Sequence, residues 1–227
     1  MASGILKFAV IGLGRFGSRL AITLTRSGAE VIAVDRNPTL VEELRDEVTL
    51  AVRLDSTSEE ALRAQGMQKV DAAIVAIGED FESSALTVAL LKELGVPCIY
   101  ARAETAVQSR ILEKIGADAI INPESEAAAR WAHRLMLPNL RQYVELGEGH
   151  SLIHTVAPAA FHGKSPFELG LRAKFGVNLV AIQRSRGGSK SAQGKVVCVP
   201  SADSRIEPGD VLILVGSNKA LADLPTD

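Results

Sequence analysis

The chain has 227 residues, of which 47% are hydrophobic and only 4% aromatic, and its formal net charge is −2. These values predict one large or two unequal globular domains with an aliphatic core, and the balanced charge gives no electrostatic footprint for nucleic acid or an anionic membrane. No apolar run approaches the roughly 18–20 residues that span a bilayer, and we expect no signal peptide. We therefore expect a cytoplasmic protein. Cys98 and Cys198 stand alone in apolar segments, and we expect both to be small buried thiols.

Short apolar runs alternate with amphipathic segments over the first 137 residues. These runs are too short for helices and too apolar for half-exposed strands, which is typical of strands buried on both faces of a parallel sheet. The expected strands are Phe8–Ile11, Val31–Val34, Leu50–Leu54, Ala72–Ile77, Ile99–Ala101 and Ala119–Ile121. Their alternation with helices predicts an α/β fold, a Rossmann-type doubly wound parallel sheet with right-handed crossovers.

Residues that begin and end helices separate these strands. Asn37 before Pro38 is typical of a helix N-cap and first helical position, and Ser58 precedes two acidic residues that suit a first turn. Glycines that close helices are expected at Gly28, Gly95 and Gly116. One more helix is expected at Glu124–Leu137, and it carries Trp131.

A glycine-rich loop joins the first expected strand to the first helix. Its residues are Gly12, Leu13, Gly14, Arg15, Phe16 and Gly17. In this context Gly12 permits a tight turn, Gly14 allows phosphates to approach the backbone, and Gly17 allows the helix to pack on the strand. Phosphates then meet the positive end of the helix, so the loop predicts an adenine nucleotide site.

Polar residues at the ends of the following strands complete this predicted site. Asp35, 21 positions after Gly14, is placed to accept hydrogen bonds from ribose hydroxyls and to repel the 2′-phosphate of NADP, although the neighbouring Arg36 weakens that exclusion. Asp55 and Ser56 form a polar edge within reach of the adenine. The expected binding residues also include Ile77, Gly78 and Arg102 at the ends of later strands.

Arg15 occupies a variable position of the loop beside the phosphates. An arginine there adds a permanently charged, bidentate phosphate partner and favours ATP or ADP, with NAD or NADH as the other candidates. The alternative is an arginine that faces solvent from the first helical turn.

The sequence pattern changes near Pro138. We expect a nucleotide-binding domain over residues 1–137, a linker at 138–143 and a small α+β domain over 144–227. In this last domain, strands are expected at Ser151–Val156, Asn178–Ile182, Lys195–Val199 and Val211–Val215, with one helix near Ser165–Lys174 and an exposed loop at Arg184–Gly194.

Residues for catalysis are not evident. We expect His133, His150, His154 and His162 to be surface or packing residues, and no His, Cys and carboxylate cluster has metal-ligand spacing. An NAD-dependent oxidoreductase with an unusually small second domain remains an alternative function.

Several runs along the whole chain carry a family resemblance. The run Ala9–Gly17 resembles the opening of the regulator-of-potassium-conductance (RCK) family, and in particular its KtrA/TrkA-type cytosolic subunits. Matching runs follow at Ile74–Asp80, Leu91–Pro97, Val107–Ile121, Asn122–Glu124, Gly163–Ser165, Leu169–Gly176 and Glu207–Asp210.

This resemblance implies a regulatory subunit and not an enzyme. Such subunits form dimers that assemble into an octameric ring beneath an integral membrane potassium channel or transporter, and bound ATP, ADP or NAD(H) sets the shape of the ring. Regulation of a cation antiporter is the alternative within this class. We hypothesise that the helix Glu124–Leu137 joins the nucleotide domain to the second domain and moves in the switch, with Trp131 at a subunit or domain contact. The alternative for Trp131 is a position in the core.

The resemblance also implies roles for individual residues. Arg15 matches the arginine associated with the terminal phosphates of ATP. Glu124 matches an acid associated with ATP and a divalent cation near the dimer interface, although Asn122 replaces the histidine that precedes it in the family. Arg172 and Asn178 match contacts of cyclic di-AMP in part of the family. The alternative for Arg172 is an ordinary exposed helix residue.

Overall fold

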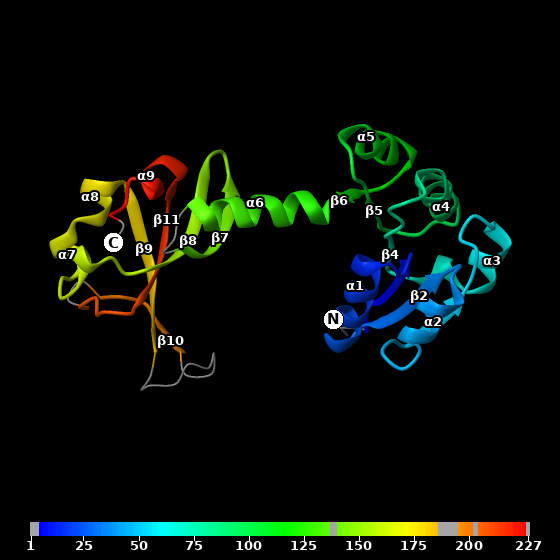
Figure 1. Ribbon diagram of the computed structural model, residues 1–227, viewed down its shortest axis with the longest axis horizontal. Coiled ribbons are helices and arrows are strands. Elements are labelled where there is room, and N and C mark those ends of the chain that lie inside the picture. Colours follow the sequence, from blue (N-terminus) through cyan, green and yellow to red (C-terminus); the bar gives the residue numbers. More distant parts are fainter. Residues whose placement is uncertain (1–4, 137–139, 186–194, 202–203, 226–227) are drawn as a thin grey trace. The chain divides into compact units, whose positions relative to one another are not determined.

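The computed structural model describes residues 5–136, 140–185, 195–201 and 204–225, apart from the side chains of residues 133, 134, 136, 140, 185 and 195–198. By its internal contacts the chain divides into two units, Met1–Glu126 and Ala127–Asp227 (Figure 1). The division falls inside helix α6 (Pro123–Met136), which therefore begins in the first unit and continues in the second. In the described residues, no helix is long and apolar enough to cross a membrane.

The first unit is a six-stranded parallel sheet with the order β3-β2-β1-β4-β5-β6. This order confirms the predicted doubly wound Rossmann-type sheet, in which the direction of winding reverses between β1 and β4. Its strands are β1 (Lys7–Ile11), β2 (Glu30–Asp35), β3 (Leu50–Arg53), β4 (Ala72–Val75), β5 (Ile99–Arg102) and β6 (Ala119–Ile121). Its helices are α1 (Arg15–Arg26), α2 (Pro38–Leu44), α3 (Glu59–Ala64), the short 3₁₀ helix η1 (Met67–Lys69), α4 (Phe81–Glu93) and α5 (Ala106–Ile115).

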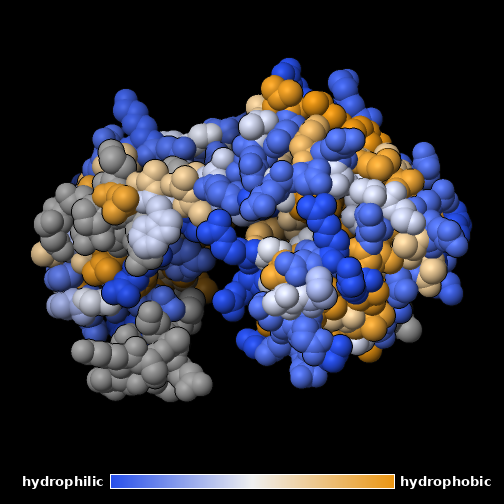
Figure 2. Space-filling model, turned by 45° about the vertical axis from the view of Figure 1, so that its right-hand side comes forward, coloured by the Kyte–Doolittle hydropathy of each residue, from blue (hydrophilic) through white to orange (hydrophobic). Residues whose placement is uncertain are grey.

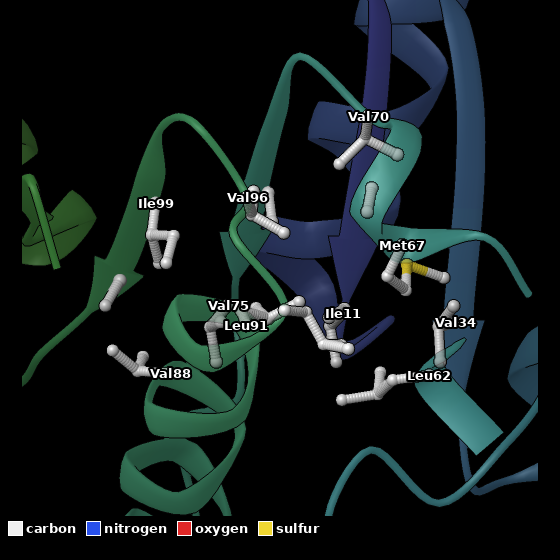
Figure 3. Packing of buried hydrophobic residues seen from close by; sticks show 14 of the residues in the cluster. Ile11, Val34, Leu62, Met67, Val70, Val75, Val88, Leu91, Val96 and Ile99 are labelled. Carbon is white, nitrogen blue, oxygen red and sulfur yellow. The ribbon is translucent and has the colours of Figure 1, made fainter. Parts of the chain in front are cut away.

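Alternating side chains of the parallel strands fill two separate cores. On β1, Ala9 and Ile11 point into a core that includes Leu62 of α3 and Leu91 of α4 (Figure 3), whereas Val10 joins a core on the other face. The second core includes residues of α1 and α2. Because both faces are covered, the strands need apolar residues at successive positions, which explains the apolar runs of the sequence.

The predicted helix ends are present. The Asn37 side chain accepts a hydrogen bond from the Thr39 N–H at 3.0 Å, and the Ser58 hydroxyl accepts one from the Ala61 N–H at 3.3 Å. Asn122 has a comparable role that we did not foresee, because its side chain accepts from the Ser125 N–H at 2.9 Å in the first turn of α6. The residue that replaces the family's histidine thus begins the helix that joins the two units.

The second unit contains a five-stranded antiparallel sheet with the order β10-β9-β11-β8-β7. The strands are β7 (Leu140–Gly147), β8 (His150–Val156), β9 (Val177–Ser185), β10 (Lys195–Cys198) and β11 (Val211–Ser217). Its other elements are η2 (Ala159–Phe161), α7 (Pro166–Leu169), α8 (Leu171–Phe175) and α9 (Asn218–Ala222). The expected α+β fold is confirmed, and its core contains residues of the sheet together with Phe161, Leu169 and Leu221.

Three expectations for this unit need correction or fall outside the structure. Residues 140–143, expected in the linker, belong to β7, which pairs with β8, whereas 138 and 139 lie outside the described residues. Helix α9 was not expected, and two short helices replace the single helix near Ser165–Lys174. Of the expected loop Arg184–Gly194, the first two residues belong to β9 and the rest lie outside the described residues.

A buried carboxylate fixes the turn before β11. Asp210 is only 2% exposed, and its two oxygens accept hydrogen bonds from Arg184 Nε at 2.9 Å and Nη2 at 2.8 Å. Burial alone raises the pKa of Asp210, but the bonds from Arg184 and from the Glu207 N–H outweigh burial and lower it below its ordinary value.

Candidate nucleotide-binding site

The glycine loop folds as its spacing predicts. Gly12 has a φ of +94°, and a Cβ on it would lie 2.9 Å from the backbone nitrogen of Ile77, so only glycine fits where the loop meets the end of β4. Gly17 is buried in α1, and a Cβ there would overlap the Gly12 carbonyl oxygen. A Cβ on Gly14 would meet nothing within 4 Å, because this residue faces open space.

The open space beside Gly14 is a cavity of about 420 Å³ at the carboxyl ends of the strands. Twelve of the fourteen predicted binding residues line it; Leu13 and Gly17 do not. The lining also includes residues that we did not predict: Ile11, Val34, Asn37, Leu40, Leu54, Ala76, Glu79, Asp80, Ser83 and Glu104. Glu79, Asp80 and Glu104 lie two or three residues after the predicted strand ends Ile77 and Ala101, and this position was the signal that could have identified them.

Asp35 fixes the glycine loop as well as lining the cavity. Its Oδ2 accepts a hydrogen bond from the Leu13 N–H at 2.7 Å, and its Oδ1 accepts one from the Asn37 N–H at 2.7 Å. The Leu13 amide is therefore not free to bind phosphate. Each oxygen of Asp35 keeps a second lone pair, which is what a ribose hydroxyl requires as an acceptor.

Asp55 and Ser56 differ in what they offer a ligand. Asp55 is exposed, and hydrogen bonds from the Thr57 hydroxyl at 2.7 Å and amide at 3.0 Å hold its pKa below the ordinary value. Ser56 is only 8% exposed, and its hydroxyl bonds to that of Thr87 on α4 at 2.8 Å. The Ser56 side chain therefore connects β3 to α4 in the interior instead of presenting a polar edge to the adenine.

The arginines of the cavity differ in their partners. Arg15 is exposed at the start of α1, and no carboxylate of the described residues forms an ion pair with it. Arg36 lies 3.6 Å from Asp80, whose pKa is lowered by hydrogen bonds from Ser83 in the first turn of α4. Arg102 Nη2 donates to Glu124 Oε1 at 2.8 Å and to Glu104 Oε1 at 3.2 Å.

The cavity is acidic overall. Three arginines line it, Arg15, Arg36 and Arg102, together with six carboxylates: Asp35, Asp55, Glu79, Asp80, Glu104 and Glu124. Among the described residues, no three His, Cys, Asp or Glu side chains form a group that could hold a metal ion.

The histidines with described side chains lie in the second unit. His150 is exposed and its Nδ1 lies 3.1 Å from the Glu148 carbonyl oxygen, while His162 Nε2 lies 3.0 Å from that of Ala157. His154 is partly buried, and burial lowers its pKa. These positions agree with surface or packing roles; the His133 side chain lies outside the described residues, as does that of Cys198, and Cys98 is a half-buried free thiol.

Arg172 on α8 and Asn178 on β9 are both exposed in the second unit. This unit also has a cavity of about 490 Å³, whose charged lining includes Lys164, Lys174 and Arg205. Neither Arg172 nor Asn178 lines it. The predicted cyclic di-AMP contacts thus lie outside this cavity.

Comparison with known proteins gives matches over both units. The TrkA-N domain family matches residues 8–123 and the TrkA-C domain family matches residues 153–224. Ktr system potassium uptake protein C of Bacillus subtilis is 41% identical over 93% of this chain and 92% of its own length, and protein A of the same organism is 36% identical over 94% and 92%.

Among solved structures, the GsuK channel aligns with 98% of this chain and 39% of its own, with a TM-score of 0.63 and 16% identity, which supports the fold alone. The family matches decide against the oxidoreductase alternative, because Ktr regulatory RCK proteins are not enzymes. The chain therefore belongs to the TrkA-N/TrkA-C (RCK) family and is a homologue of the Ktr potassium uptake proteins A and C.

Proposed function

We propose that this protein is a nucleotide-sensing regulatory subunit that gates a membrane potassium channel or transporter in response to ATP and ADP. One observation carries the proposal: the glycine loop, Asp35 and Arg15 meet at one cavity at the switch point of the sheet. Sheets of this order bind nucleotides there, with the phosphates at the helix N-terminus. The full-length homology to Ktr potassium uptake proteins supplies the biological setting.

Arg15 is the residue that we assign to sensing the terminal phosphate. Its guanidinium is exposed at the first position of α1 and forms no ion pair with a carboxylate of the described chain. A phosphate therefore does not have to displace a carboxylate from it. Because a ligand shifts a conformational equilibrium only by its differential affinity, a residue that distinguishes ATP from ADP is required for switching.

In this proposal, helix α6 transmits the change at the nucleotide cavity to the second unit. Its first turn contributes Glu124 to the cavity, and the same helix continues into the second unit. Trp131, the only tryptophan of the chain, is 55% exposed and follows Glu124 by two helical turns. Its fluorescence should therefore report nucleotide-dependent changes around α6.

Exposed apolar side chains support self-association. Leu86 on α4 and Val107 and Ile111 on α5 are exposed, as are Trp131 and Leu135 on α6. Figure 2 shows apolar residues among polar ones near the top of the first unit, at the height of α5 in Figure 1. Exposed apolar patches mark contact surfaces, so we propose a homodimer that assembles into an octameric ring at the cytoplasmic side of its integral membrane partner.

Two further ligands belong to the proposal. A divalent cation would bind at Glu124 together with ATP, with ligands from the phosphates or a second subunit. Cyclic di-AMP would bind at Arg172 and Asn178, where an arginine suits a phosphate and an asparagine suits a base edge. Regulation of a cation antiporter is the competing assignment, and transport assays with each class of membrane partner separate the two.

A thermal-shift panel with ATP, ADP, NADH, NADPH and cyclic di-AMP tests the binding proposal, because a ligand stabilises the fold that it binds. We expect ATP and ADP to raise the melting temperature more than NADPH, whose 2′-phosphate meets Asp35. Light scattering on the same samples measures particle size. The absence of a shift with every adenine nucleotide would contradict the proposed function.

A further inference from the structure

Arg102 lies where a dinucleotide would place its second nucleoside. In sheets of the order 3-2-1-4-5-6, a dinucleotide crosses the switch point, with its second half beyond the carboxyl ends of β4 and β5. In this chain Gly78 follows β4 and Arg102 ends β5, and both line the same cavity as the glycine loop.

The guanidinium of Arg102 packs directly on Gly78. A Cβ on Gly78 would overlap Arg102 Nη1 and lie 2.9 Å from Cζ. The Arg102 side chain is only 17% exposed, and its Nη2 is bonded to Glu104 and Glu124. A nicotinamide riboside in this position would have to displace the arginine and leave Glu104 and Glu124, whose side chains are 49% and 63% exposed, without their cationic partner. The loss of these charge-assisted hydrogen bonds is unfavourable.

The present arrangement leaves one donor of Arg102 unsatisfied. Its Nε is buried and has no hydrogen-bond partner among the described residues. A buried unpaired donor lowers stability, so an acceptor that reaches Nε while Nη2 keeps its bonds to the glutamates is bound favourably. A terminal phosphate leaving the glycine loop toward β4 is such an acceptor, and it offers the charge-assisted, bidentate geometry that arginine binds best.

We propose that Arg102 is a specificity-determining residue, which excludes the second nucleoside of NAD and binds the β-phosphate, which is free of a second nucleoside in ADP and ATP. This inference rests on the proposed function, because it requires an adenine nucleotide in the cavity. It assigns the preference for ADP and ATP over NAD to the β4–β5 half of the site, whereas Arg15 distinguishes ATP from ADP in the other half.

The test compares dissociation constants for ADP, by calorimetry, and for NADH, by its own fluorescence, in the full-length protein. We expect the wild-type protein to bind ADP about tenfold or more tightly than NADH, and Arg102→Ala to reduce that ratio about tenfold by weakening ADP and strengthening NADH. The matched control is Arg63→Ala, which removes an arginine that is also paired with a glutamate, Glu59, but does not line the cavity.

The outcomes separate the inference from the proposed function. Equal weakening of ADP and NADH by Arg102→Ala overturns the inference and leaves nucleotide sensing intact. Wild-type protein that binds NADH as tightly as ADP overturns it without any variant, so a misfolded Arg102→Ala does not remove the test. Loss of binding for every nucleotide in the wild-type protein contradicts the proposed function instead.

Discussion

Two glycines of the glycine loop, Gly17 and Gly14, should respond differently to substitution by alanine: Gly17→Ala should lower the stability of the fold, and Gly14→Ala should lower the affinity for nucleotide. A Cβ at Gly17 overlaps the backbone oxygen of Gly12, which no side-chain rotation relieves. Overpacking of this kind costs about 3 kcal/mol, and the gain from replacing a helical glycine is about 1 kcal/mol, so we expect Gly17→Ala to lower the free energy of unfolding by about 2 kcal/mol. For a unit of this size, the melting temperature should fall by about 8 °C.

Gly14→Ala is the matched variant. Gly14 has a φ of −66°, and a Cβ there meets no protein atom within 4 Å, so the stability should change by less than about 0.5 kcal/mol. The methyl group instead projects into the space beside the loop, and nucleotide affinity should fall at least about tenfold. Circular dichroism melts and calorimetric titration with ADP measure the two effects. A Gly17→Ala protein as stable as the wild type, or a Gly14→Ala protein with unchanged ADP affinity, would refute the geometry.

Substitutions at three other places test separate parts of the molecule. Arg15→Ala should weaken ATP more than ADP in calorimetric titration, and equal losses would exclude phosphate sensing by this residue. Ser56→Ala breaks the buried hydroxyl–hydroxyl bond to Thr87, and Thr87→Val breaks this bond and the one that Thr87 donates to the Ser56 carbonyl oxygen at 3.3 Å. Each should lower the free energy of unfolding by about 1–2 kcal/mol, and the double variant should lose less than the sum; additive losses in urea denaturation would contradict the pairing. Because the pKa of Asp210 is lowered in the fold, its stabilisation should be present above its ordinary pKa of 3.8 and lost as the pH falls through the lowered value. Asp210→Asn should lower the free energy of unfolding near neutral pH by about 2 kcal/mol. This is less than for a fully buried ion pair, because the partner Arg184 is partly exposed. An unchanged acid dependence of unfolding in the variant would contradict this role.

The sequence was sufficient to predict the first unit because its central strands, such as β1 and β4, are covered on both faces. Such strands must be apolar at successive positions, so β1 and β4 stood out as short apolar runs. In contrast, β7 is an edge strand whose run from Leu140 to Gly147 mixes polar and apolar residues, and we assigned its first residues to a linker. Edge strands carry a weaker periodic signal because only part of their surface is buried.

Which residues line the cavity could be predicted from their places at the ends of the strands. The carboxyl ends of parallel strands converge, so the order of Asp35, Ile77 and Arg102 along the chain was enough to bring them to one cavity. What a side chain bonds to depends on atoms distant in sequence. Pattern alone could not show that Ser56 turns inward to Thr87, or that Arg102 is already paired with Glu124.

Six carboxylates and three arginines line the cavity beside the glycine loop, so the charge of its lining is negative overall. The affinity of a basic site for an anion falls as the salt concentration rises, because salt screens the attraction. The affinity of an acidic site for an anion rises instead, because cations screen the repulsion between the anion and the carboxylates. We therefore expect the affinity for ADP to rise with potassium chloride concentration. In a homologue of potassium uptake proteins, that dependence would make the proposed nucleotide site itself responsive to the potassium concentration.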